Sequence, residues 1–201
     1  MLLHVSHAAH PGHHKMLIRT VDTDVVVLAV FAIRQLTAGC ELWLAFGTRK
    51  SFLYLAAQQI AVCLGPERSC ALPMFHTLTG CNTASSFAGQ GKKTAWSTWK
   101  SLPELTDAIL MLANGPKEIP DDAMNIIERF VILLFERTST CTQVDHARRK
   151  LFPRKNSAQQ IPPTRAALLS TSGEQSTRVV TSGGRHCYQT LCCHHQLTGG
   201  G

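Results

Sequence analysis

The sequence predicts an α/β fold in which a short, mostly parallel sheet flanked by helices is followed by an all-helical C-terminal half. Strand-like and helix-like patterns alternate as far as Leu64, and only helical patterns follow it. The apolar content of 44% is enough to build a core, and a chain of 201 residues has room for one domain and a tail. We therefore place a domain over residues 1–169 and a tail over residues 170–201.

The first part of the chain carries three short strand signals. They are rich in β-branched, aromatic and other apolar residues and cover residues 16–20, 41–45 and 52–55. The β-branched run over residues 25–32 predicts a buried strand that continues into a helix. Residues 2–10 read as the end of a helix, and helices are predicted over 55–64 and 70–78. Gly65-Pro66 is a stop signal for the first of these two.

The second part of the chain carries only helical patterns, over residues 92–100, 103–112, 121–137 and 144–152. Trp96 and Trp99 share one face of the first of these helices, which is typical of core anchors. The last helix is basic, with Arg148, Arg149 and Lys150 followed by Arg154 and Lys155. Its charged face fits either a solvated surface or a surface that follows phosphates, and the pattern leaves both interpretations open.

The stretch over residues 79–95 combines a small-residue turn, a Gly-x-Gly step and a basic helix start. Gly89 and Gly91 allow close approach of another molecule, and Lys92 and Lys93 then open a helix. A helix N-terminus points free N–H groups outward, and these groups favour an anion such as phosphate. The four residues therefore indicate a grip on a nucleic-acid backbone. The alternative is an ordinary turn that leads into a helix, without a ligand.

Two carboxylates, Asp22 and Asp24, stand two residues apart beside the β-branched run. On a strand both side chains would lie on one face, where a cation between them would relieve their repulsion. Mg²⁺ binds through one or two carboxylates with waters and substrate phosphates. In the alternative interpretation one Asp caps a turn and the other is solvated. His76, in an apolar helical pattern, is predicted to be a packed core residue.

The order of these motifs resembles that of the flap-endonuclease-like 5′ nucleases of the PIN-like fold group. The run from Leu72 to Asn82 is similar to uncharacterised PIN-like proteins of marine invertebrates and fish, which read Leu-Pro-x-Phe-His-x-Leu-Thr-Gly-Cys-Asp. The resemblance covers about residues 2–169. It implies Mg²⁺ or Mn²⁺ as cofactor, with Asp22, Asp24 and Asn82 along one side of the metal site.

The same resemblance implies that Asp22 and Asp24 lie within about 10 Å of Asn82, a separation that two bridging ions could span. It also implies a helix–turn–helix in which Gly89, Gly91, Lys92 and Lys93 hold a duplex backbone. Two departures bear on activity. Asn82 stands where the family has Asp, and the family's upstream acidic cluster and first strand, with its leading Asp, are missing. The likeness also stops after Leu169. We interpret the chain as an N-terminally truncated fragment with a disordered, out-of-frame or mis-spliced tail.

These observations predict a degenerate, inactive 5′-nuclease-like domain that binds nucleic acid. The alternatives are a non-enzymatic interaction module and a gene fragment without a function. A formal charge of +7 fits a DNA or RNA backbone as partner. The longest apolar run, residues 25–33, is far shorter than the roughly 20 residues that a membrane span requires. The scattered cysteines favour free thiols in a reducing compartment, and hence an intracellular protein, cytoplasmic or nuclear.

Overall fold

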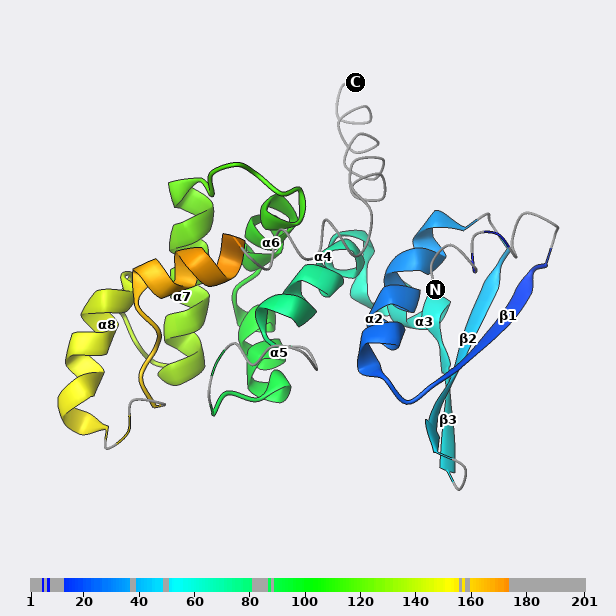
Figure 1. The fold of residues 1–201 in the computed structure, drawn as a ribbon, viewed down its shortest axis with the longest axis horizontal. Helices are drawn as coiled ribbons and strands as arrows, with labels where there is room; N and C mark the ends of the chain where they lie inside the picture. Colours follow the sequence, from blue (N-terminus) through cyan, green and yellow to red (C-terminus); the bar gives the residue numbers. More distant parts are fainter. Residues whose placement is uncertain are drawn as a thin grey trace. The chain divides into compact units, whose positions relative to one another are not determined.

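The computed structural model describes residues 5, 7, 13–36, 39–48, 51–80, 87, 89–155, 157 and 160–173. The chain forms two compact units, Met1–His76 and Thr77–Gly201. Figure 1 shows the strands in the first unit, and the regular elements among the described residues of the second unit are all helices, as predicted. Asn82 and residues 174–201 lie outside the described residues.

The first unit contains a three-stranded sheet of β1 (Lys15–Thr20), β2 (Glu41–Thr48) and β3 (Ser51–Ala56), in that spatial order. β1 is parallel to β2, and β3 is antiparallel to β2. The prediction of a mostly parallel sheet was therefore wrong, and the sheet is mixed. The reason is the short connection between Thr48 and Ser51, because a parallel pair needs a crossover of a dozen or more residues.

Helix α2 (Thr23–Ala32) connects the two parallel strands and is followed by a short 3₁₀ helix, η1 (Ile33–Gln35). The prediction that its β-branched run starts as a strand was wrong. Asp22 has an extended backbone, and its side chain accepts a hydrogen bond from the Asp24 N–H at 2.9 Å. This N-cap and the burial of the later residues outweigh the low helix propensity of Val25, Val26 and Val27.

Helices α3 (Ala57–Leu64) and α4 (Pro66–Leu78) meet at Gly65. Gly65 has a φ of 77° and a ψ of 170°, a backbone conformation that is readily open to glycine alone. Its N–H bonds the carbonyl of Ala61 at 3.1 Å. Helix α4 begins at Pro66 rather than at the predicted Cys70, because proline is well suited to the first turn of a helix.

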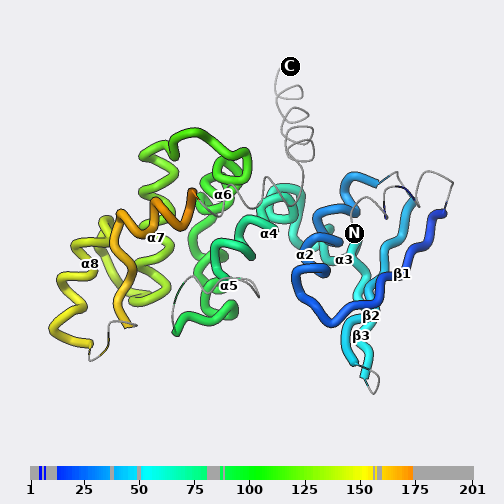
Figure 2. Tube along the Cα trace, in the orientation of Figure 1, coloured from blue at the N-terminus to red at the C-terminus, as the bar shows by residue number. Residues whose placement is uncertain are grey.

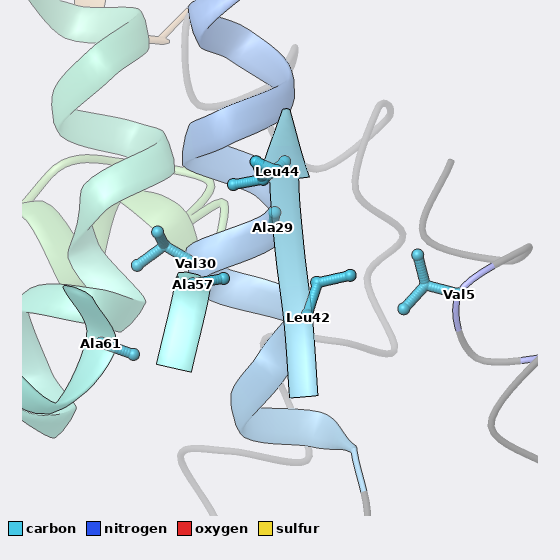
Figure 3. Close-up of a cluster of buried hydrophobic side chains, with 7 residues drawn as sticks. All are labelled: Val5, Ala29, Val30, Leu42, Leu44, Ala57 and Ala61. Atoms are coloured by element: carbon cyan, nitrogen blue, oxygen red, sulfur yellow. The ribbon is translucent and has the colours of Figure 1, made fainter. Parts of the chain in front are cut away.

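The core of the first unit lies between one face of the sheet and the helices α2 and α3. Small side chains of the helices allow the close approach, and the larger Leu42 and Leu44 of β2 fill the space between them. Figure 3 shows this cluster, which consists of Val5, Ala29, Val30, Leu42, Leu44, Ala57 and Ala61. The sheet therefore buries one face against its own helices.

The second unit is built around α7 (Asp121–Phe135), which packs against three other helices. These are α5 (Lys92–Ser101), α6 (Leu105–Ala113) and α8 (Val144–Leu151), and a short 3₁₀ helix, η2 (Phe152–Arg154), follows α8. Figure 2 shows the path of the chain through these elements. Residues 165–173 are also helical, so regular structure continues past Leu169, where the predicted tail begins.

Polar contacts fasten the later segments of the second unit to α7. Glu128, only 1% exposed, accepts a hydrogen bond from the Val144 N–H at 2.8 Å and pairs with Arg165. Arg165 also pairs with Asp121 at 3.0 Å. A buried carboxylate is costly unless it is paired and hydrogen-bonded, and Glu128 has both kinds of partner. Trp99 is likewise buried, as predicted, and its indole N–H donates to Thr106 Oγ1 at 3.0 Å.

We expect Leu44→Ala to destabilise the first unit by about 2–5 kcal/mol, because it removes a fully buried side chain from the core. Leu53→Ala is the matched control, since Leu53 lies on the neighbouring strand and is 60% exposed. Urea unfolding followed by far-UV circular dichroism measures both. Equal losses of stability in the two variants would contradict the placement of the core.

Candidate functional site

Asp22 and Asp24 lie just beyond the C-terminal end of β1, at the start of α2. Thr20 Oγ1 accepts a hydrogen bond from the Asp22 N–H at 3.0 Å, and the Asp22 carboxylate caps α2 through the Asp24 N–H. The first half of the alternative interpretation, an Asp that caps a turn, is confirmed. The idea that strand alternation places both side chains on one face was wrong, because the second Asp already belongs to a helix.

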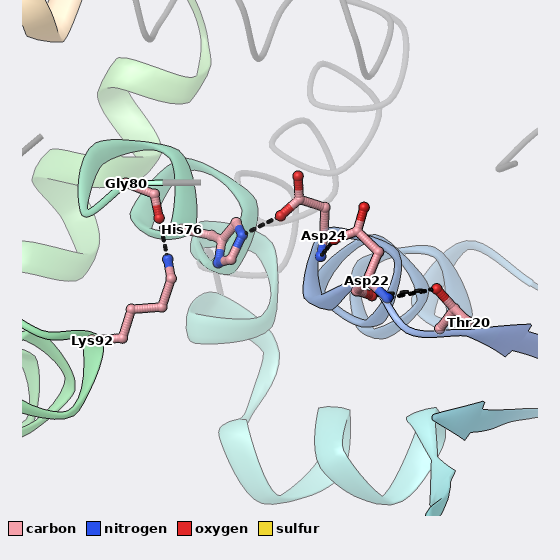
Figure 4. Close-up of polar contacts among 6 residues, drawn as sticks. All are labelled: Thr20, Asp22, Asp24, His76, Gly80 and Lys92. Atoms are coloured by element: carbon pink, nitrogen blue, oxygen red, sulfur yellow. Dashed lines mark hydrogen bonds and ion pairs between the residues drawn. The ribbon is translucent and has the colours of Figure 1, made fainter. Parts of the chain in front are cut away.

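Asp24 is bonded to His76, which lies 52 residues further along the chain, in the last turn of α4. His76 Nε2 lies 2.6 Å from Asp24 Oδ1, and Figure 4 shows the two side chains directed at each other. An ionised carboxylate can only accept, so the imidazole Nε2–H is the donor. His76 is 8% exposed, so the prediction that it is packed in the core is confirmed. Asp24 is therefore not the freely solvated carboxylate of the alternative interpretation.

Each of the two carboxylates at this position has an internal partner. The Asp24 carboxylate is already bonded to an imidazole, and that of Asp22 already bonds the backbone of α2. Within the described part of the chain, no three His, Cys, Asp or Glu side chains are grouped so that they could hold a metal ion. Asn82, the third predicted ligand, lies outside the described residues, as does its predicted distance to Asp22 and Asp24.

Lys92, the first lysine of the predicted phosphate grip, has an internal partner. Helix α4 ends at Leu78, and Gly80 follows with a φ of 96°. The Lys92 ammonium donates a hydrogen bond to the Gly80 carbonyl (Figure 4). A lysine near a helix C-terminus stabilises the carbonyl end of the helix. The contact fits the alternative interpretation of this stretch as a structural turn, at least for Lys92.

The other residues of the predicted grip differ among themselves. Gly89 has a φ of 78°, which favours glycine, whereas Gly91 has an ordinary φ of −80° and open space where a Cβ would stand. Gly91 is the N-cap of α5 and offers no side-chain cap to it. Lys93 is exposed, and its ammonium has no hydrogen bond or ion pair with any described residue. Residues 81–86 and 88, which complete the predicted helix–turn–helix, lie outside the described part.

Helix α8 presents a basic face, which the sequence pattern left undecided between two interpretations. Val144, Ala147 and Leu151 are buried against the second unit, and Arg148 donates to the Pro162 carbonyl. The cations on the outside are Arg149, Lys150, Arg154 and Lys155, all of them exposed. The structure thereby separates one arginine with a packing role from four cations that point into solvent.

Comparison of the chain with protein-family models, with curated proteins and with solved structures found no match. The resemblance to the PIN-like fold group therefore stays a prediction. Among the described residues, no helix combines the length and the apolar character needed to cross a membrane.

We expect Asp24 and His76 to be energetically coupled by about 1–2 kcal/mol, because the side chains share a short hydrogen bond and Asp24 is only partly exposed. A double-mutant cycle with Asp24→Ala and His76→Ala measures this in urea unfolding. Glu67→Ala combined with His76→Ala is the control, since exposed Glu67 stands at the opposite end of α4. Additive effects for Asp24 and His76 would show that the contact contributes nothing.

Proposed function

We propose that this protein is a non-catalytic, 5′-nuclease-like protein that binds the phosphate backbone of DNA or RNA without sequence preference. The observation that carries the proposal is the exposed basic face of the α8–η2 segment. Arg149, Lys150, Arg154 and Lys155 are all exposed and fall within residues 149–155, which include no acidic residue, and Asp145 stands one helical turn before Arg149. Such a cluster is the electrostatic footprint expected of a surface that contacts phosphates.

Three other arginines of the second unit differ from this group because they have internal partners. Arg129, Arg148 and Arg165 each bind a backbone carbonyl or a carboxylate within the unit. Lys150, Arg154 and Lys155 have no such partner among the described residues, and Arg149 makes only a long 3.4 Å contact to the carbonyl of Asp145. Exposed cations without a partner can also be simply solvated, so the proposal makes the specific claim that these four bind phosphates. Lys93 would extend the contact to the start of α5.

The roles of Asp22 and Asp24 support the absence of catalysis. In a metal-dependent nuclease, carboxylates hold the ions that position the attacking water and the leaving oxygen. Here one carboxylate caps α2 and the other bonds His76, so both already stabilise the fold of the first unit. The proposal includes an intracellular location, in the cytoplasm or the nucleus, where such a partner is found.

The test is a titration of duplex DNA with the whole chain at several salt concentrations. We expect affinity to fall steeply with salt, because each neutralised phosphate releases condensed counterions. Arg149→Ala with Lys150→Ala should flatten the slope of the log–log plot by about two units, at about 0.9 per lost contact. Lys93→Ala should flatten it by about one unit.

Lys100→Ala with Lys117→Ala is the control, because it removes the same charge from exposed positions outside the proposed surface. We expect this control to leave the slope nearly unchanged. Equal flattening by the two double variants would mean that only the net charge acts, and a chain without affinity for DNA or RNA would overturn the proposal.

We expect no Mg²⁺- or Mn²⁺-dependent cleavage of flapped or nicked duplex DNA, because Asp22 and Asp24 already form contacts within the first unit. Gel analysis of end-labelled substrates measures this, with and without EDTA. Cleavage that disappears in Asp22→Ala or in Asp24→Ala would contradict the non-catalytic assignment and leave the binding surface on α8 unaffected.

A further inference from the structure

The sheet of the first unit has a second face, opposite α2 and α3, which carries aromatic and charged side chains. Leu42 and Leu44 point to the core, so the alternation along β2 places Trp43 on the other face. The strand register brings Leu17 beside Trp43. It also aligns Arg19, Ala45 and Tyr54 in one row across the sheet.

This second face is open to solvent. Leu17 is 63% and Tyr54 is 62% exposed, values far from those of a packed sheet surface. A hollow of about 360 Å³ lies on it and is lined by Lys15, Met16, Leu17, Trp43 and Tyr54.

A polar contact holds the indole ring of Trp43 in place on this face. The Trp43 indole N–H donates to Glu41 Oε2 at 3.1 Å, and Lys15 lies 3.6 Å from the same carboxylate. The hydrogen bond from Trp43, and then the charge of Lys15, lower the pKa of Glu41, so the carboxylate is ionised at neutral pH. Glu41 thereby fixes the indole and offsets the charge of Lys15.

Arg19 supplies the remaining positive charge. Its guanidinium lies 4.7 Å from the centre of the Phe52 ring, on the same face of the sheet. Phe52 and Tyr54 are alternate residues of β3, so both rings share this face with Trp43. Three aromatic rings with an arginine among them form a flat surface that is both apolar and cationic.

We propose that this face binds single-stranded nucleic acid by stacking bases on Tyr54 and Trp43 while Arg19 contacts the backbone. Aromatic platforms beside positive charge are the general solution for binding single strands, because every base offers a π-face. A protein partner would need complementary acidic and apolar groups, whereas a single strand supplies flat apolar bases and anionic phosphates together. The site is separate from α8 and concerns unpaired rather than duplex strands.

The experiment measures binding of a fluorescently labelled oligothymidylate of about ten nucleotides to the whole chain. We expect Tyr54→Ala to weaken binding about tenfold, because loss of one stacking ring costs about 1–3 kcal/mol. Arg19→Ala should weaken it and flatten the salt dependence by about 0.7 units, the value for one contact to a single strand. Leu53→Ala is the matched control, with similar exposure on the same strand but on the opposite face.

Trp43→Phe keeps a stacking ring in place and removes its fluorescence. We expect this variant to bind within a few-fold of the original while most of the ligand-induced quenching of tryptophan emission disappears. Duplex binding should stay unchanged in Tyr54→Ala, so failure at this face and failure at α8 are distinguishable. Tyr54→Ala and Leu53→Ala with equal affinity for the oligonucleotide would overturn the inference, as would a Tyr54-dependent dimer that excludes the oligonucleotide.

Discussion

The hydrogen bond between Asp24 and His76 is the contact on which the interpretation of the first unit depends. It joins the first turn of α2 to the last turn of α4, across 52 residues of chain. His76 is almost fully buried, so its ring nitrogens need partners within the protein. Asp24 supplies one acceptor, and Asp22 beside it caps the helix from which Asp24 projects. An acidic pair that a sequence motif associates with metal chemistry thus has a structural use here.

The internal contact of Asp24 also affects how strongly its carboxylate can attract a ligand. A carboxylate that is shared with an imidazole attracts a cation less strongly than a free one, because part of its charge is already compensated. Most of the lysine and arginine residues of α8 and η2, by contrast, stay in solvent. Arg149, Lys150 and Arg154 therefore keep their charge at the surface of the second unit. The proposed contact with a nucleic acid uses these cations, whereas Asp22 and Asp24 form contacts within the first unit.

The two faces of the small sheet also differ, because one is buried and the other is exposed. With only three strands and two covering helices, it can bury one side, and the pleat then determines what the other side displays. Trp43 stands between Leu42 and Leu44, which both face the core, so its large aromatic side chain lies on the opposite face of the sheet. Its indole is held by Glu41 rather than left to rotate. An ordered ring on an open face is a ready surface for a flat ligand.

Much of the secondary structure could be predicted from the sequence, because residue propensity, apolar periodicity and turn residues indicate the same element in many segments. The strand patterns around Leu17, Leu44 and Leu53, the stop at Gly65 and the helix after Gly91 are all found near their predicted places. Local signals failed where the chain's own context overrides propensity. The three valines after Asp24 are helical because Asp22 caps them and the crossover between parallel strands requires a helix.

The role of the candidate residues could be decided only by the tertiary structure. No spacing in the sequence relates Asp24 to His76 or Lys92 to Gly80, since both contacts depend on how helices pack and turn. The same holds for α8, where burial separates Arg148 from Arg149 although the two are neighbours in the chain. The sequence by itself determined which residues carry charge and which prefer a helix or a strand. The structure decided which charges are satisfied internally, because a hydrogen bond depends on distances in space rather than on separation along the chain.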